Sequence, residues 1–287
     1  MPALRVFLRP PSLEAAIKLL DRYGEAARPL AGGTTLALVR NPKQDILVDL
    51  SHAGLAGIEA RDGARRIGAM TTVADVRRFL RGGTACALSD AVAGIGSRVL
   101  QNHVTVGGNC VMVYPWSDLP VVARAAGAQF DIEGTKESRR RFEAGTLYAA
   151  HPTRVLERTE VVRAVSFPTD GPGTASAFLK VTRNVGDHAL ASAAAYVTIS
   201  DGVVREARVV VGGVKGLPQL VAEAGEAMAG RPIDGEAADE AGRIAADRVG
   251  VGEDIRASAD FRRHLVAVAV ADALRTAIAR ADKAVAP

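Results

Sequence analysis

Two pairs of adjacent glycines lie in segments whose residue types suit the binding of a phosphate anion. The first segment is Ala31-Gly32-Gly33-Thr34-Thr35, and the second is Thr105-Val106-Gly107-Gly108-Asn109. Glycine permits positive φ and lets backbone N–H groups approach an anion closely, and consecutive amides arranged in this way form a concave nest for phosphate oxygens. The flanking threonines and the asparagine add side-chain hydrogen bonds. Two such nests facing each other would suit a pyrophosphate with its two negative charges.

Each loop taken alone also fits an ordinary tight turn. Gly82-Gly83 and Gly212-Gly213 are further glycine pairs, which we interpret as plain turns. Neither candidate loop matches the Gly-x-x-x-x-Gly-Lys-Ser/Thr phosphate loop, and a Gly-x-Gly-x-x-Gly dinucleotide fingerprint is missing. The prediction therefore depends on the combination of the two loops.

The elements around the first loop form a small α/β unit. A strand over residues 28–31 leads into the glycines, and a helical turn follows, so a helix dipole also favours an anion there. Before it, a strand over residues 4–8 precedes a helix that Ser12 begins and Gly24 ends. Residues 46–50 read as a buried strand, which completes a strand–helix–strand arrangement.

A second α/β unit is predicted from about residue 65. Thr72 and Asp75 resemble a capping box for the next helix, and residues 89–95 favour another helix. Residues 97–115 are interpreted as a loop with a brief strand. Further elements follow in order: a helix from Ser117-Asp118 through Val122 and Ala126, and strands over 129–132 and 161–167.

Residues 169–174 are the clearest interruption in the chain, and the main domain boundary is predicted there. We expect a domain over residues 1–171, with subdomains of about 1–54 and 55–171, and an α+β domain over 172–287. The second domain should contain a three-stranded antiparallel sheet and a helical bundle. Its elements are strands over 176–182, 189–199 and 203–211, a hairpin connector at Ser200-Asp201-Gly202, and helices over 218–229, 235–248 and 258–282.

Composition excludes several classes of protein. Aromatic residues make up 4% of the 287 residues, which predicts a core of Val, Leu, Ile and Ala and argues against a nucleic-acid surface built on base stacking. The net charge of +4 is spread along the chain; its densest run, Arg139-Arg140-Arg141 beside Lys136, suits a solvated hairpin edge better than an anionic partner. Cys86 and Cys110 are too few for an iron–sulfur cluster. The sequence predicts a cytoplasmic protein without a signal peptide or a membrane span.

The two loops, their spacing and Ser117-Asp118-Leu119-Pro120 together resemble one family. It is the FAD-binding medium subunit of the molybdenum hydroxylases, as in carbon monoxide dehydrogenase and the xanthine dehydrogenase family. The resemblance extends over essentially the whole chain. It includes Phe7-x-x-Pro10, Val48-Asp49-Leu50, Ile67-Gly68-Ala69-Met70-Thr71-Thr72 and Phe178-Leu179-Lys180.

The resemblance implies a two-part FAD-binding domain of the PCMH type, made of two α/β subdomains, in which both loops clamp the FAD pyrophosphate. Asp118 matches an acidic residue that accepts hydrogen bonds from hydroxyls of the FAD sugar or ribitol chain; with Ser117, it also suits a helix N-cap. Lys180 matches a lysine near the isoalloxazine ring, where a cation stabilises reduced flavin; the alternative is a solvated strand lysine. The implied cofactor-binding residues are Leu30, Ala31, Gly32, Gly33, Thr34, Thr35, Thr105, Gly107, Gly108, Asn109, Ser117, Asp118, Lys180 and His188.

Some positions depart from the family pattern. Gln101 stands where the family often has Arg before the second loop. His188 replaces the tyrosine of a Gly-Asp-Tyr motif, so it either stacks on the flavin and titrates near neutral pH or is an ordinary surface histidine. His103 and Cys110 lie next to the second loop. In the wider superfamily, covalent attachment commonly uses a histidine in the first loop, where this chain has threonines, so noncovalent FAD is expected. Tyr114-Pro115-Trp116 packs either over the cofactor or into a core.

The resemblance implies an electron-transfer subunit. A large partner subunit would hold the molybdenum cofactor and a small one the [2Fe–2S] clusters, and this chain would pass electrons through FAD to an acceptor. One alternative is a stand-alone flavoenzyme that oxidises a small molecule directly, and another is a non-catalytic nucleotide-binding module. The substrate and the acceptor, whether NAD, oxygen or a quinone, stay open.

Overall fold

The chain divides into two compact units, each assembled from separate stretches of sequence. The computed structural model describes residues 6–39, 44–135, 138–233 and 236–285. Unit 1 comprises Met1–Phe79, Ser97–Met112 and Ala128–Pro168, and unit 2 comprises Leu80–Gly96, Val113–Gly127 and Thr169–Pro287. Residues 4 and 5 of the predicted first strand, Lys136, and residue 235 of the predicted helix over 235–248 lie outside the described residues.

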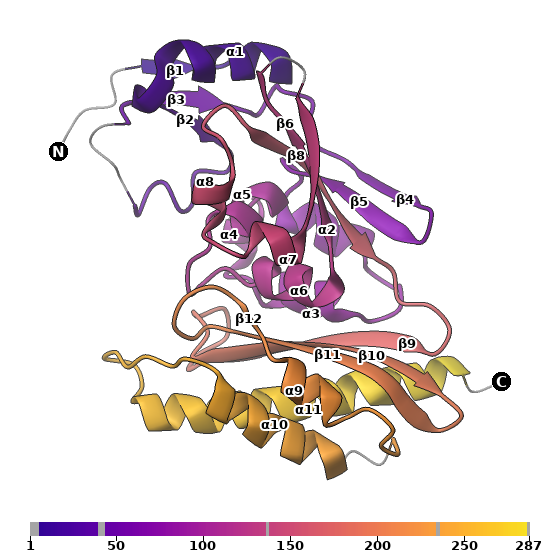
Figure 1. The fold of residues 1–287 in the computed structure, drawn as a ribbon. Coiled ribbons are helices and arrows are strands. Elements are labelled where there is room, and N and C mark those ends of the chain that lie inside the picture. The colour runs from indigo at the N-terminus through magenta and orange to yellow at the C-terminus, as the bar shows by residue number, and fades with distance from the viewer. Residues whose placement is uncertain (1–5, 40–43, 136–137, 234–235, 286–287) are drawn as a thin grey trace. The chain divides into compact units, whose positions relative to one another are not determined.

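Unit 1 begins with a three-stranded parallel sheet in the order β1-β3-β2, covered by helix α1 (Figure 1). Ser12 caps α1 by accepting a hydrogen bond from the Ala15 N–H at 3.1 Å, and Gly24 ends it with φ of 56°. Apolar residues at helical spacing along α1 are buried against the strands. The predicted strand–helix–strand unit is confirmed. Its elements are β1 (Val6–Leu8), α1 (Leu13–Tyr23), η1 (Gly24–Ala26), β2 (Ala27–Leu30) and β3 (Ile46–Asp49).

A five-stranded antiparallel sheet forms the rest of the unit 1 framework. Its order is β4 (Ile58–Arg61), β5 (Ala64–Gly68), β8 (Val161–Pro168), β6 (Gln129–Glu133) and β7 (Arg139–Glu143). The basic run lies on the edge strand β7, as predicted. Arg140 donates two hydrogen bonds to the buried Glu160 carboxylate at 2.7 and 2.6 Å, and Arg141 pairs with Asp131 at 2.9 Å. These arginines therefore stabilise the hairpin edge.

Short helices connect the strands of unit 1. The predicted capping box at the start of α2 is found in part: the Thr72 hydroxyl accepts a hydrogen bond from the Asp75 N–H, but the Asp75 carboxylate accepts from that hydroxyl instead of from the Thr72 backbone. The prediction of loop and brief strand over residues 97–115 is wrong in part: Ser97 and Thr105 each cap a short helix there. The helices are α2 (Val73–Phe79), α4 (Arg98–Gln101), α5 (Val106–Val111), α7 (Ala144–Leu147) and α8 (Pro152–Val155).

Unit 2 is built on an antiparallel sheet in the order β12-β11-β10-β9. The sheet has four strands, not the predicted three. The additional strand β12 is only Gln219–Leu220, in a segment expected to be helical, and it forms because it pairs with Val210 and Val211 of β11. The Asp201-Gly202 turn of the β10–β11 hairpin has positive φ at both residues, which confirms the predicted connector. The longer strands are β9 (Thr174–Val181), β10 (Ala191–Ser200) and β11 (Val203–Gly212).

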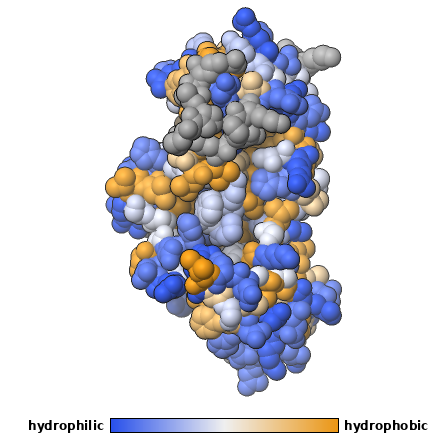
Figure 2. Space-filling view, turned by 90° about the vertical axis from the view of Figure 1, so that its left-hand side faces the viewer, coloured by the Kyte–Doolittle hydropathy of each residue, from blue (hydrophilic) through white to orange (hydrophobic). Residues whose placement is uncertain are grey.

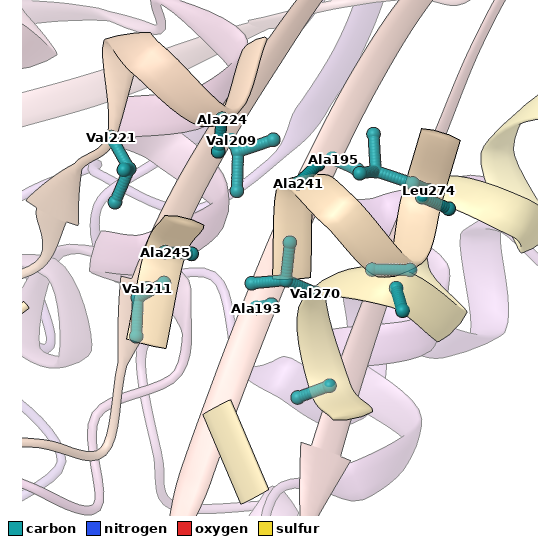
Figure 3. Close-up of a cluster of buried hydrophobic side chains, with 14 of the residues drawn as sticks. Ala193, Ala195, Val209, Val211, Val221, Ala224, Ala241, Ala245, Val270 and Leu274 are labelled. Carbon is teal, nitrogen blue, oxygen red and sulfur yellow. The ribbon is translucent and has the colours of Figure 1, made fainter. Parts of the chain in front are cut away.

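Helices pack on both faces of this sheet. Because successive side chains of a strand point to opposite faces, Ala193 and Ala195 of β10 face α10 and α11, as do Val209 and Val211 of β11 (Figure 3). On the opposite face, α3 (Ala87–Gly94) packs against β9 and α6 (Leu119–Ala126) packs against β10 and β11. The core is almost wholly Ala, Val, Leu and Ile, as the scarcity of aromatic residues predicts.

Three helices follow the sheet in sequence. They are α9 (Ala222–Glu226), α10 (Glu236–Arg248) and α11 (Ala259–Val285). The last two agree closely with prediction, whereas the predicted helix over 218–229 is reduced to α9. The surface at the lower end of Figure 2, where α10 and α11 lie in Figure 1, is largely hydrophilic. These helices therefore combine an apolar face on the sheet with a polar face in solvent.

Candidate functional site

The residues singled out from the sequence are divided between the two units. Both glycine loops, residues 30–35 and 105–109, belong to unit 1. Ser117, Asp118, Lys180 and His188 belong to unit 2. Each group is described within its own unit.

The first loop presents a run of unused backbone donors. It follows β2, whose last residue Leu30 accepts a hydrogen bond from the Leu50 N–H at 2.9 Å, and Gly33 then takes a left-handed conformation with φ of 72°. Within the described part of the chain, the backbone N–H groups of residues 32–36 donate to no protein acceptor. A backbone N–H that is removed from water and left without an acceptor is costly. This half-buried stretch of free N–H groups is therefore suited to bind an anion.

Gly32 fixes the place of the first loop against the second. A Cβ atom at Gly32 would lie 1.6 Å from the His103 carbonyl oxygen, a separation that no side chain permits. A Cβ at Gly108 would lie 3.7 Å from the Cβ of Ala31. The two loops are therefore neighbours in unit 1, and glycine at position 32 is required by the close approach of two backbones.

The second loop is the first turn of helix α5, and the amides of residues 106–109 are already bonded. Thr105 caps the helix by accepting a hydrogen bond from the Gly108 N–H at 3.2 Å. The Val106 and Gly107 N–H groups donate to the Thr71 and Ala69 carbonyls at 3.0 and 2.9 Å. The nest of free amides expected from the sequence is thus found in the first loop but not in the second. Gly107 has a packing role, because its Cβ would lie 2.6 Å from that of Ala69.

In unit 2, Asp118 and Lys180 form a buried ion pair. The Lys180 Nζ lies 2.8 Å from the Asp118 Oδ2 and donates a second hydrogen bond to the Gly94 carbonyl at 3.2 Å. The Lys180 side chain is 10% exposed and the Asp118 side chain 2%, so the alternative of a solvated strand lysine is wrong. Burial raises the pKa of Asp118 to about 6, and the neighbouring Lys180 cation opposes this rise. The negative charge that balances Lys180 therefore changes with pH near 6.

The expected capping role of Ser117 and Asp118 is not found. Asp118 occupies the N-cap position of α6, but its side chain accepts no hydrogen bond from the helix. The Ser117 hydroxyl accepts one from the Tyr114 N–H at 3.2 Å, ahead of the helix. The carboxylate of Asp118 is directed to Lys180 instead, a pairing across 62 residues that no local pattern reveals.

Three ring-bearing side chains of unit 2 lie together, and two of them are stacked. Tyr114 and Trp116 are parallel with ring centroids 4.7 Å apart, and Trp116 lies 5.1 Å from the His188 ring at an interplanar angle of 31°. Tyr114 and Trp116 are half-buried and so do not fill a core, while His188 is exposed. Partial burial lowers the pKa of His188, Arg256 and Lys180 lower it further, and Asp187 opposes them. His188 is therefore mainly neutral at pH 7.

The side chain of Gln101 is buried in unit 1 rather than directed at solvent. It is 2% exposed, and its Oε1 accepts a hydrogen bond from Arg77 Nη1 at 3.1 Å. A guanidinium therefore lies beside this position although the residue itself is glutamine. Sequence reasoning missed Arg77, because it comes from α2 and only the fold brings it to Gln101.

Neither cysteine has the environment of a reactive thiol. Cys86 and Cys110 are both free and buried, and burial raises the pKa of Cys110 to about 12. Among the described residues, no group of three His, Cys, Asp or Glu side chains is placed to hold a metal ion. No helix in that same part of the chain is both long and apolar enough to cross a bilayer.

Comparison with known proteins matches both parts of the chain. Residues 3–170 match the family described as FAD binding domain in molybdopterin dehydrogenase, and residues 176–277 match the CO dehydrogenase flavoprotein C-terminal domain. The carbon monoxide dehydrogenase medium chain of Afipia carboxidovorans is 31% identical over 95% of this chain and 96% of its own length. The nicotine 6-hydroxylase medium subunit of Paenarthrobacter nicotinovorans is 26% identical over 93% and 94%.

A solved structure of carbon monoxide dehydrogenase from Hydrogenophaga pseudoflava, which lacks the Mo-pyranopterin moiety of its molybdenum cofactor, has the same fold. It superposes with a TM-score of 0.91 at 28% identity, covering 98% of this chain and 99% of the other. The free amides of the first loop, the close approach at Gly32 and these matches lead to one assignment. The chain belongs to the molybdenum hydroxylase family, as an FAD-binding subunit of the carbon monoxide dehydrogenase medium-chain type.

Proposed function

We propose that this chain is the electron-transfer subunit of a molybdenum-dependent hydroxylase or dehydrogenase. It accepts electrons from [2Fe–2S] clusters on a partner subunit and passes them through FAD to an external acceptor. The observation that carries the proposal is the run of unpaired amides at residues 32–36, held in place by the contact of Gly32 with the His103 carbonyl. Such a loop binds a pyrophosphate without a lysine or a metal ion.

The residues present suit each part of FAD. The first loop offers backbone donors to the pyrophosphate. The second loop lies next to the first, and its polar side chains are Thr105 and Asn109. The carboxylate of Asp118 accepts hydrogen bonds from sugar or ribitol hydroxyls, and Lys180 and His188 act on the ring. The proposed binding set comprises residues 30–35, Thr105, residues 107–109, Ser117, Asp118, Lys180 and His188. FAD, when bound, supplies the redox chemistry.

Partner subunits follow from what the chain contains. Its two cysteines cannot supply the four thiolates of an ordinary [2Fe–2S] cluster, so in this proposal the clusters that reduce FAD are held by another subunit. The relatives described above are named as the medium chain or medium subunit of enzymes that act on different substrates, carbon monoxide and nicotine. We therefore assign substrate choice to a large molybdenum-cofactor subunit and the clusters to a small subunit.

The proposal keeps the domain boundary near residue 171, a cytoplasmic location and noncovalent FAD. It is tested by purifying the chain from its native source under mild conditions. Two partner subunits carrying molybdenum and iron should accompany it, and substrate should reduce the flavin only when they are present. Turnover of a small molecule by the isolated, metal-free chain would establish the stand-alone flavoenzyme instead.

A further inference from the structure

Arg262 is a charged residue at a position where a charge is costly. Its side chain is 4% exposed, near the start of the 27-residue helix α11. A guanidinium so deeply buried persists only where its donors are satisfied. Its contacts therefore indicate what it holds together.

Those contacts join three separate segments of unit 2. Arg262 Nη1 donates to the Leu190 carbonyl at 2.7 Å and to the Gly213 carbonyl at 3.3 Å, while Nη2 lies 2.8 Å from the Asp254 Oδ1. Leu190 ends the loop that contains His188, and Gly213 follows β11. One side chain thus fixes the ends of two loops of the sheet and the segment before α11.

Asp254 extends this connection toward His188. Its carboxylate accepts hydrogen bonds from the Arg256 backbone N–H at 2.9 Å and from Arg256 Nη2 at 2.8 Å. Arg256 and Arg262 together hold the pKa of Asp254 well below its usual range, so the carboxylate stays ionised. Arg256 in turn acts electrostatically on His188.

We propose that Arg262 is a positioning residue that holds the His188 ring against Trp116 and sets the charge around it. It does so by tying the loop before β10 to the Asp254–Arg256 segment. The charged groups that act on His188 are Asp187 from its own loop, Lys180 from β9 and Arg256 from the segment before α11. Arg256 is bonded to Asp254, which pairs with Arg262, so loss of Arg262 should change both the ring contact and the charge that Arg256 places near His188. The importance of this for redox chemistry rests on the proposed place of His188 at the flavin.

Histidine NMR on the full FAD-loaded chain tests the inference. The chain has five histidines and one tryptophan, so His188→Gln assigns the His188 Hε1 signal and Trp116→Leu measures the ring-current shift that Trp116 causes. Arg262→Met should remove that shift and move the His188 titration midpoint upward, toward that of a free histidine. Arg262→Lys should restore part of both effects. Arg263→Met is the matched control, because Arg263 is 49% exposed and pairs with Asp260, one turn earlier in the same helix, and it should leave both unchanged.

Asp254→Asn keeps the test decisive if Arg262→Met does not fold. It removes the carboxylate charge that balances Arg256 but leaves the Arg262 bonds to the two carbonyls, so the His188 midpoint should move while the ring-current shift largely persists. Folded Arg262 and Asp254 variants whose His188 shift and midpoint equal those of the unmodified chain would overturn the inference. If the NMR effects appear but His188→Gln leaves the flavin potential unchanged, the positioning stands and the proposed role of His188 fails.

Discussion

Replacement of Gly32 by alanine tests the first loop most severely. The new Cβ would lie 1.6 Å from the His103 carbonyl oxygen, and this separation must open to at least 3.0 Å, a displacement of about 1.4 Å. A hydrogen bond of ordinary length does not survive such a shift. Loss of two amide–phosphate bonds, at about 1.5–3 kcal/mol each for a charged acceptor, would weaken FAD binding by about 10²- to 10⁴-fold.

The assay is equilibrium titration of the deflavinated chain with FAD, followed by flavin fluorescence. Gly145→Ala is the control, because Gly145 lies in α7 of the same unit and the nearest atom to its added Cβ is 3.9 Å away. It should leave FAD affinity unchanged within about twofold. A folded Gly32→Ala chain with the affinity of the unmodified protein would refute the assignment of the first loop to the pyrophosphate.

Three further predictions concern groups whose surroundings are unusual. Burial raises the pKa of Asp118 from 3.8 to about 6, so between these values the native state holds a proton that the unfolded state has lost. The contribution of Asp118 to stability should therefore be complete below about pH 4 and fall by up to roughly 3 kcal/mol as pH rises past 6. Urea unfolding of the unmodified chain and of Asp118→Asn over that interval isolates this contribution, and an identical pH dependence in the two proteins would contradict the assignment. Arg140→Ala removes the two hydrogen bonds that Arg140 donates to the buried Glu160 carboxylate, leaving the bond from the Glu157 N–H, and should lower the free energy of unfolding by about 1.5–3 kcal/mol. Arg139→Ala, on a side chain 72% exposed, should cost less than about 0.5 kcal/mol, and equal losses in the two variants would show that the structure assigns the wrong arginine. The pKa of Cys110, raised by burial to about 12, keeps its thiol protonated, so iodoacetamide at pH 8 should label it only after unfolding; rapid labelling of the native chain, seen by mass spectrometry, would exclude the buried position.

The sequence was most informative where structure is local. The caps at Ser12 and Thr72 and the Asp201-Gly202 turn depend on side chains within four residues of the backbone that they order. The six-residue helix α5 was missed for a different reason. Two glycines have poor intrinsic helix propensity, and α5 is stabilised by Gly107 packing on Ala69, a contact between distant segments.

Pairing between distant strands was the other source of error. β12 contains only two residues, which is too short for an alternating pattern to be detected. It forms because it pairs with β11. β4 was also missed: it is an edge strand with three of its four residues exposed, which leaves little hydrophobic pattern.

The candidate site divides in the same way. Its glycines and polar residues were found from motifs, because the residue types needed for phosphate are restrictive. The groups that hydrogen-bond to these polar residues were not found from motifs. The Gly94 carbonyl that holds Lys180 and the Arg77 side chain beside Gln101 come from elements whose packing no local pattern encodes.

The proposed role rests on FAD held by this chain and reduced through its partners. The most direct measurement is anaerobic reduction, followed in the flavin absorption band, of the complex purified from its native source. We expect one noncovalent FAD per chain, released by acid. Enzyme substrate should bleach the flavin in the intact complex but leave it oxidised in the separated chain. Absence of FAD from the purified chain after FAD addition, or bleaching by substrate in the chain alone, would contradict the account.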